Sequence, residues 1–210
     1  MVIGCGAHAS SVISIIESSN DNYEIIGLID TADHYDENEI INDYKVILSL
    51  KDLLNVPERY TNVSFFLAIG DNTVRKGIFD ILLNKNFILP NIVSSSAFVD
   101  RTVRMGVGNI ISHSAVINAG VVLVDNNLIN TASIIEHHCT INSHNHIAPR
   151  ALLCGGVNIS NMVFVGAGSI LLPNVSVADS STIGAGSLLL TDVKQKGLTY
   201  LGTPAKVKIK

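Results

Sequence analysis

The second half of the chain places an aliphatic residue at every sixth position without a break. Seventeen successive positions hold only aliphatic residues or Met: Val93, Val99, Met105, Ile111, Ile117, Leu123, Ile129, Ile135, Ile141, Ile147, Leu153, Ile159, Val165, Leu171, Val177, Ile183 and Leu189. The position four residues later is always Ala, Ser, Val, Cys or Asn: Ala97, Val103, Asn109, Ala115, Val121, Asn127, Ser133, Cys139, Asn145, Ala151, Val157, Val163, Ser169, Val175, Ser181, Ser187 and Val193. A period of six fits neither an α-helix nor a simple hairpin. It predicts a parallel β-solenoid in which short strands and corners alternate, three of each per coil, with the aliphatic residues inward.

The first ninety residues follow a different pattern. Short apolar runs alternate there with helix-length amphipathic segments, in the order 1–4, 8–19, 24–30, 64–71 and 73–85. Such alternation is typical of βαβ units around a parallel sheet. We therefore expect two domains: a Rossmann-like α/β domain over residues 1–90, and a β-helix over residues 91–210 that ends in a short tail.

The first turn of the α/β domain, GCGAHA at residues 4–9, is a weak form of the dinucleotide fingerprint that lacks its third glycine. Asp30 lies near the place of the ribose-binding acid, and Gly70 follows a later strand. Ligands of parallel sheets bind at the carboxyl ends of the strands, so these residues could form a nucleotide pocket. Glycine and Asp also favour ordinary turns, and both interpretations remain open. The first strand is short, and we expect the true start of the chain to lie upstream.

Composition and charge exclude several classes of partner. The net charge is −4, and basic residues form no run before the short end VKIK, which excludes a nucleic-acid stripe and a polybasic membrane patch. No apolar run reaches the roughly 18 residues of a membrane span, and the start lacks the regions of a signal peptide. Cys5, Cys139 and Cys154 show no paired spacing, so neither a disulfide framework nor a CxxC metal site is supported. We expect a cytoplasmic protein that binds small molecules, neither nucleic acid nor membrane.

Four of the seven histidines lie in the stretch IEHHCTINSHNHI at residues 135–147. In the hexad pattern Ile135 points inward, which leaves Glu136, His137 and His138 on the outer surface or at a corner. The spacing matches neither HxxxH nor H-x-x-E-H, which argues against a metal site. From the residues alone, the histidines could be a purely structural row of polar side chains, or one of them could be a general base assisted by its neighbours.

The hexads, which include FVGAGS and TIGAGS, resemble those of the hexapeptide-repeat acyltransferases, and the segment GTPAK resembles the ending common in that family. Together with GCGAHA, LID and FLAIGDNTVRK, they make the whole chain similar to the UDP-4-amino-sugar N-acetyltransferases of bacterial glycan synthesis, with the sialic acid O-acetyltransferase group as a close relative. The resemblance implies a left-handed parallel β-helix and a homotrimer. A lone prism would also expose flat apolar strands, which favours assembly.

The activity that this resemblance implies is transfer of acetyl from acetyl-CoA, without a metal, to the 4-amino group of a UDP- or dTDP-linked amino-dideoxy sugar. O-acetylation of sialic acid or a related sugar is the alternative. A nicotinamide-dependent enzyme could bind its cofactor with GCGAHA and Asp30, but that activity would leave the β-solenoid without a function. A non-catalytic scaffold is a third possibility, because solenoids also serve as binding surfaces. The sequence leaves open which nucleotide and sugar bind and whether an amine or a hydroxyl is acetylated.

The family pattern assigns a role to each candidate residue. His137 matches the general base, which suits an imidazole because an attacking amine must lose a proton near neutral pH. His138 stands where relatives carry Asp or Glu, and Glu136 could supply the missing negative charge. The resemblance assigns the cofactor to four residues, of which the first contacts the thioester: His146, Gly155, Ala167 and Ala185. It assigns the nucleotide sugar to six residues: Gly6, Ala7, His8, Asp30, Thr31 and Gly70.

Overall fold

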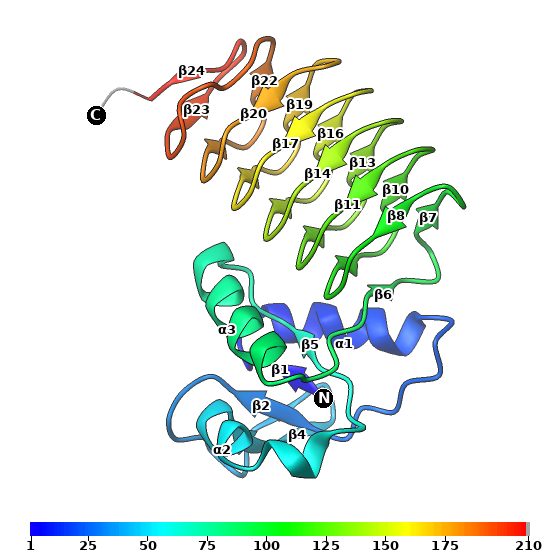
Figure 1. Cartoon of the computed structure of the whole chain (residues 1–210), viewed down its shortest axis with the longest axis vertical. Helices are drawn as coiled ribbons and strands as arrows, with labels where there is room; N and C mark the ends of the chain where they lie inside the picture. Colours follow the sequence, from blue (N-terminus) through cyan, green and yellow to red (C-terminus); the bar gives the residue numbers. More distant parts are fainter. Residues whose placement is uncertain (209–210) are drawn as a thin grey trace.

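The computed structural model describes residues 1–208 and has two parts. A triangular prism of stacked coils stands on a small α/β domain (Figure 1). This is the Rossmann-like domain followed by a left-handed parallel β-helix that the sequence predicts, and the prediction of the fold class is confirmed.

The α/β domain has one sheet of five strands in the order β3-β4-β2-β1-β5. Its strands are β1 (Val2–Ile3), β2 (Leu28–Asp30), β3 (Ile40–Ile41), β4 (Tyr44–Ser49) and β5 (Phe66–Leu67). Only β3 runs antiparallel to its neighbour. The helical segments are α1 (His8–Ser18), α2 (Leu50–Asn55), the 3₁₀ turn η1 (Pro57–Tyr60) and α3 (Asn72–Asn84). α1 and α3 coincide with the two predicted amphipathic segments.

The β-helix builds three faces from strands of two residues. Face I holds β6 (Ile92–Val93), β9 (Ile110–Ile111), β12 (Leu128–Ile129), β15 (His146–Ile147), β18 (Phe164–Val165) and β21 (Thr182–Ile183), followed by β23 (Thr199–Leu201) and β24 (Lys206–Val207). Face II holds β7 (Phe98–Val99), β10 (Val116–Ile117), β13 (Ile134–Ile135), β16 (Leu152–Leu153), β19 (Ile170–Leu171) and β22 (Leu188–Leu189). Face III holds β8 (Arg104–Met105), β11 (Val122–Leu123), β14 (Thr140–Ile141), β17 (Asn158–Ile159) and β20 (Ser176–Val177).

Each coil stacks in parallel on the next with a shift of 18 residues, as when Ile117 pairs with Ile135 and Ile135 with Leu153. The chain turns at three edges, which we name by the faces they join: edge I/II, edge II/III and edge III/I. From Ile111 onward every hexad aliphatic is buried in one continuous core. The inward direction predicted for these residues is thereby confirmed.

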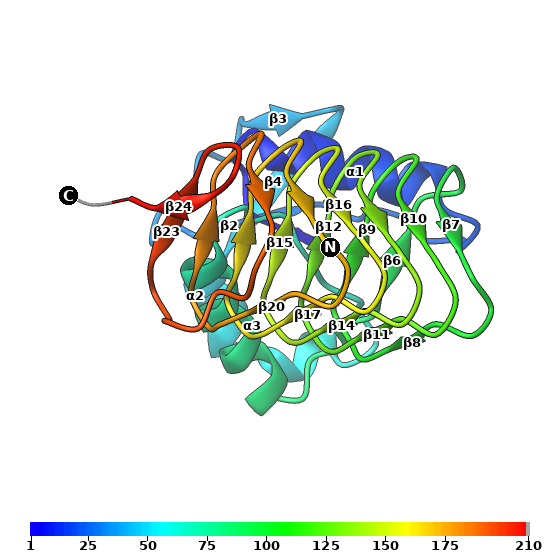
Figure 2. The same ribbon diagram turned by 90° about the horizontal axis from the view of Figure 1, so that it is seen from above.

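The α/β domain packs on the lower part of face I. Ile92, Ile110 and Leu128 point outward from this face and are buried against a cluster that includes Val12 and Ile16 of α1. Figure 2 shows α1 along one side of the prism and α3 along the other. Because α1 lies at edge I/II and α3 at edge III/I, edge II/III is the one that faces away from the α/β domain.

Candidate active site

The first turn of the α/β domain runs from the end of β1 into α1. Gly4 has a φ of +110°, and a Cβ there would lie 2.8 Å from the Ala68 carbonyl oxygen, so this position requires glycine. A Cβ on Gly6 would meet no atom within 4 Å. α1 begins at His8 without a side-chain cap, and its N-terminal N–H groups can therefore serve an anionic ligand.

The structure brings the predicted substrate residues to one edge of the sheet. β2 and β5 flank β1, so Asp30 at the end of β2 and Gly70 just after β5 lie on either side of the turn that contains Gly6. Thr31 and Ala7 are both exposed at this edge. The arrangement is the one in which parallel sheets bind nucleotides.

A cluster that the sequence analysis did not single out lines the same edge. The Cys5 thiol and the carboxylates of Asp30 and Glu39 lie within 4.8 Å of one another. Burial, followed by the two carboxylates, raises the pKa of the Cys5 thiol to about 12. The thiol is therefore protonated at neutral pH.

His146 lies on face I, against the α/β domain. Its Nδ1 donates to the Gly70 carbonyl oxygen at 3.3 Å, and its Nε2 accepts from the Asn130 side-chain amide at 3.1 Å. Burial, followed by the charge of Arg75, lowers the pKa of His146 to about 4, so its ring is neutral. The same two causes lower the pKa of His8, whose Nε2 is buried and has no partner within residues 1–208. His146 therefore lies with the substrate residues, and its predicted contact with the thioester stays a prediction.

A cavity of about 360 Å³ opens beside Gly70 and His146, between the start of α3 and face I. Gly70, Asn72 and Thr73 line it from one side, and Phe164 and Thr182 line it from the other. The Phe164 ring also packs edge-on against His146, with 5.1 Å between the ring centroids. The β-helix thus supplies one wall of the pocket, which the sequence analysis had placed in the α/β domain alone.

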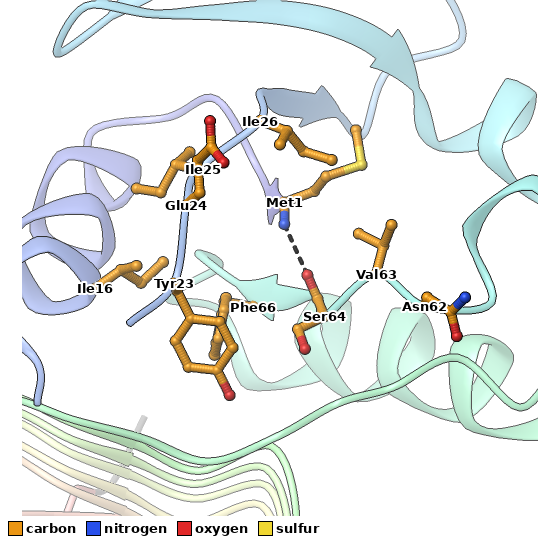
Figure 3. A pocket seen from close by; sticks show the side chains of 10 residues that line it. All are labelled: Met1, Ile16, Tyr23, Glu24, Ile25, Ile26, Asn62, Val63, Ser64 and Phe66. Atoms are coloured by element: carbon orange, nitrogen blue, oxygen red, sulfur yellow. Dashed lines mark hydrogen bonds between the residues drawn. The ribbon is translucent and has the colours of Figure 1, made fainter. Parts of the chain in front are cut away.

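A second cavity, of about 270 Å³, lies at the opposite end of the sheet (Figure 3). Its lining is mostly apolar and includes Tyr23, Ile25, Val63 and Phe66. These residues are close to the amino ends of the strands, whereas ligands of parallel sheets bind at the carboxyl ends. We therefore place the candidate nucleotide pocket at the carboxyl ends of the strands.

His137 and His138 lie together at edge II/III, and both are exposed. Their Nδ1 atoms are 3.1 Å apart, and the rings meet edge to face. Gly155, one coil further on, leaves room for this pair, because a Cβ there would lie 2.5 Å from Cε1 of His137. A cavity of about 280 Å³ is lined by both histidines, Gly155, Gly156, Pro173 and Asn174.

The hydrogen bond between the two rings couples their tautomers. Only one Nδ1 can carry the shared hydrogen when both rings are neutral. If His137 donates it, Nε2 of His137 keeps a free lone pair, as a general base requires. The Glu136 carboxylate accepts a hydrogen bond of 3.0 Å from the Asn118 amide and not from the His137 ring. The observed hydrogen-bond partner of the His137 ring is His138. A catalytic role for Glu136 stays a prediction.

Ala167 and Ala185 lie at edge I/II on successive coils, and Arg150 lies at the same edge on the coil below. A Cβ on Gly166 would lie 2.5 Å from the Ala185 nitrogen, so the coils approach closely here. His137 and Gly155 occupy a different edge. A single chain therefore divides the predicted residues among three places: edge II/III, edge I/II, and the carboxyl ends of the α/β strands with the adjoining cavity on face I.

Residues 1–82 match the PglD N-terminal domain family. No protein among curated sequences matches the chain. Within residues 1–208, no helix combines the length and apolar character needed to cross a membrane.

Solved structures match nearly the whole length. A histidine-to-asparagine mutant of perosamine N-acetyltransferase from Caulobacter crescentus, in complex with CoA and GDP-perosamine, is 27% identical with a TM-score of 0.90, and the match covers 100% of this chain and 96% of that one. The acetyltransferase domain of PglB from Neisseria gonorrhoeae, in complex with acetyl coenzyme A, is 29% identical with a TM-score of 0.88, covering 99% and 97%. WeeI from Acinetobacter baumannii, at 19% identity and a TM-score of 0.86 over 99% and 98%, shares the fold. None of these three is described as a sialic acid O-acetyltransferase, and that part of the resemblance is not supported.

Proposed function

We propose that the chain transfers an acetyl group from acetyl-CoA to the amino group of a nucleotide-linked amino-dideoxy sugar. The observation that carries this proposal is the match over the whole length to perosamine N-acetyltransferase with CoA and GDP-perosamine bound. The uncapped start of α1 beside the pocket on face I, and the histidine pair at edge II/III, support it independently, because they offer an anion-binding turn and a general base.

In the proposed reaction the sugar nitrogen attacks the thioester carbonyl carbon while Nε2 of His137 accepts a proton from that nitrogen. The tetrahedral intermediate then collapses, the C–S bond breaks, and the departing CoA thiolate takes the proton held on Nε2 of His137, which returns the base to its neutral form. His138 accepts the Nδ1 hydrogen of His137 and holds the tautomer that leaves Nε2 free. Nearby backbone or side-chain N–H groups would stabilise the oxyanion.

The proposal requires more than one copy of the chain, because edge II/III faces away from the chain's own pocket. Face II supplies a surface for assembly: its outward residues are all apolar, namely Phe98, Val116, Ile134, Leu152, Ile170 and Leu188. On face III four of the five outward residues are polar, namely Arg104, Thr140, Asn158 and Ser176. An unbroken apolar face on a rigid sheet is typical of a subunit interface.

Three copies packed through face II around an axis form the assembly that we propose. Each copy then places its edge II/III beside edge I/II of the next copy. His137 and Gly155 of one chain meet Ala167, Ala185 and the α/β domain of its neighbour, and acetyl-CoA occupies the groove between them. This arrangement joins the three groups of predicted residues that a single chain keeps apart.

Mixed assemblies test the shared site. Gly6→Val projects into open space and is expected to block the nucleotide pocket without disturbing the fold, whereas His137→Ala removes the base from an intact pocket. Each variant alone should be nearly inactive. When the two are co-expressed in equal amounts, about a quarter of the sites combine an intact His137 with an intact pocket, and acetyl transfer should return to about that fraction of wild type. Activity no higher than that of the single variants would show that each site lies within one chain.

A further inference from the structure

Arg75 is a fully buried cation between the two domains. It lies in the first turn of α3 and is 0% exposed. Within residues 1–208 no carboxylate pairs with it, and the ion pair in that part of the chain joins Lys76 and Asp80. Burial lowers the pKa of Arg75 to about 10, and Asp71 opposes this shift, so the guanidinium stays charged at neutral pH.

Oxygen atoms from both domains take the place of a counter-ion. On the α/β side the guanidinium donates to the carbonyl oxygens of Ile69 (3.0 Å) and Gly70 (3.2 Å) and to Oδ1 of Asn72 (2.7 Å). On the β-helix side it donates to the carbonyl oxygens of His144 (3.2 Å), Asn145 (3.1 Å) and Asn126 (3.4 Å). A buried charge is tolerated only with this degree of hydrogen bonding, and the planar guanidinium suits several acceptors at once.

The Gly70 carbonyl oxygen links this network to the candidate pocket. It accepts from Arg75 on one side and from Nδ1 of His146 on the other. Asn72 completes the connection, because its amide donates to the Val163 carbonyl oxygen on the β-helix at 3.1 Å. Gly70 and Asn72 also line the cavity between α3 and face I, so two residues bonded to Arg75 form part of the pocket wall.

We propose that Arg75 is a positioning residue that fixes the segment Gly70–Thr73 against the β-helix and so shapes the binding pocket for the nucleotide sugar. Its place on the buried side of α3, bonded to carbonyls of both domains, gives it no direct contact with the reacting atoms. The inference rests on the proposed function for the identity of the ligand, whereas the fixing of the segment does not depend on that identity.

Steady-state kinetics of Arg75→Lys and Arg75→Met test the role. Lysine keeps the charge but cannot reach acceptors on both sides with a planar fork. We expect the KM for the nucleotide sugar to rise by about 10-fold in Arg75→Lys and further in Arg75→Met, with the KM for acetyl-CoA unchanged. The reason is that the hydrogen bonds of Arg75 do not reach Gly155 at edge II/III or Ala167 and Ala185 at edge I/II. Lys76→Met, which removes the neighbouring, partly exposed cation and its ion pair with Asp80, should change neither KM.

Hydrogen exchange provides a readout that needs no substrate. Amide exchange over residues 69–73 should be faster in Arg75→Lys than in Lys76→Met, while the β-helix core keeps its protection. If Arg75→Met fails to fold, Asn72→Ala, which removes one acceptor of Arg75 and the bond to Val163, should show the same effects at smaller size. Equal changes in both KM values, or an unchanged exchange rate at 69–73, would overturn the inference. Failure of the wild-type enzyme to acetylate any amino sugar, with faster exchange still seen in Arg75→Lys, would overturn the proposed function alone.

Discussion

His137→Ala is expected to lower kcat by about 10²- to 10⁴-fold, with little change in the KM for either substrate, because a positioned acid–base group acts on the transition state. The lower end of this range applies if the sugar amine is already largely neutral when bound. Steady-state measurement of CoA thiol release checks the effect. Asn158→Ala, at an exposed polar position of face III, is the control and should retain full activity.

His138 separates the roles of the two rings. His138→Ala should cost less than His137→Ala, because it removes the partner that fixes the tautomer and leaves the proton acceptor in place. His138→Asp introduces the carboxylate that the family resemblance implies at this position and should keep most of the activity. If His137→Ala remains nearly fully active while His138→Ala or His144→Ala abolishes transfer, the base has been assigned to the wrong histidine.

Leu152→Glu is expected to break the assembly and, with it, the activity. Leu152 points outward near the middle of face II, and the added carboxylate would be buried between copies. Burial of an unpaired charge costs roughly 3 kcal/mol or more, which weakens association about 100-fold or more. Light scattering should therefore give a monomeric mass, and acetyl transfer should fall with it.

The matched control for this variant is Asn158→Glu, which places the same charge on face III. It should leave both the mass and the activity unchanged, since that face is polar and exposed. A monomeric mass for the wild-type chain, or a Leu152→Glu variant that keeps its assembly and activity, would contradict the proposed interface.

The β-helix could be predicted because one pattern decides it. Each hexad repeats the same choice of an inward aliphatic residue and a small corner residue, so a single period fixes the direction of every side chain. The 18-residue coil also implies contacts that could have been foreseen. Asn118 and Glu136 are one coil apart and are hydrogen-bonded, and His137 and Gly155 are one coil apart and in contact.

Counting residues along the 18-residue coil also shows where the site prediction was incomplete. His146 follows His137 by nine residues, which is half a coil, and so lies on a different side of the prism. Arg75 was missed although it shares a helical face with Ile78, Phe79 and Leu82, where a lone charged residue is a sign of a buried network.

The docking of the α/β domain could not be read from the pattern. Outward residues are apolar both on face I, as at Ile110, and on face II, as at Ile134. The sequence identifies such residues as surface positions, whereas the choice of face depends on the shape of two folded domains. Contacts such as that between Ser14 and His113, 99 residues apart, have no local signal.

The most direct test of the account is acetyl transfer by the wild-type chain to a panel of acceptors, with the products analysed by mass spectrometry. The panel comprises UDP-, dTDP- and GDP-linked 4-amino sugars, their 4-hydroxy counterparts, and free sialic acid. We expect thiol release from acetyl-CoA and an N-acetyl product with at least one 4-amino sugar nucleotide, and none with its 4-hydroxy counterpart. Transfer to sialic acid alone, or no thiol release with any acceptor, would contradict the account.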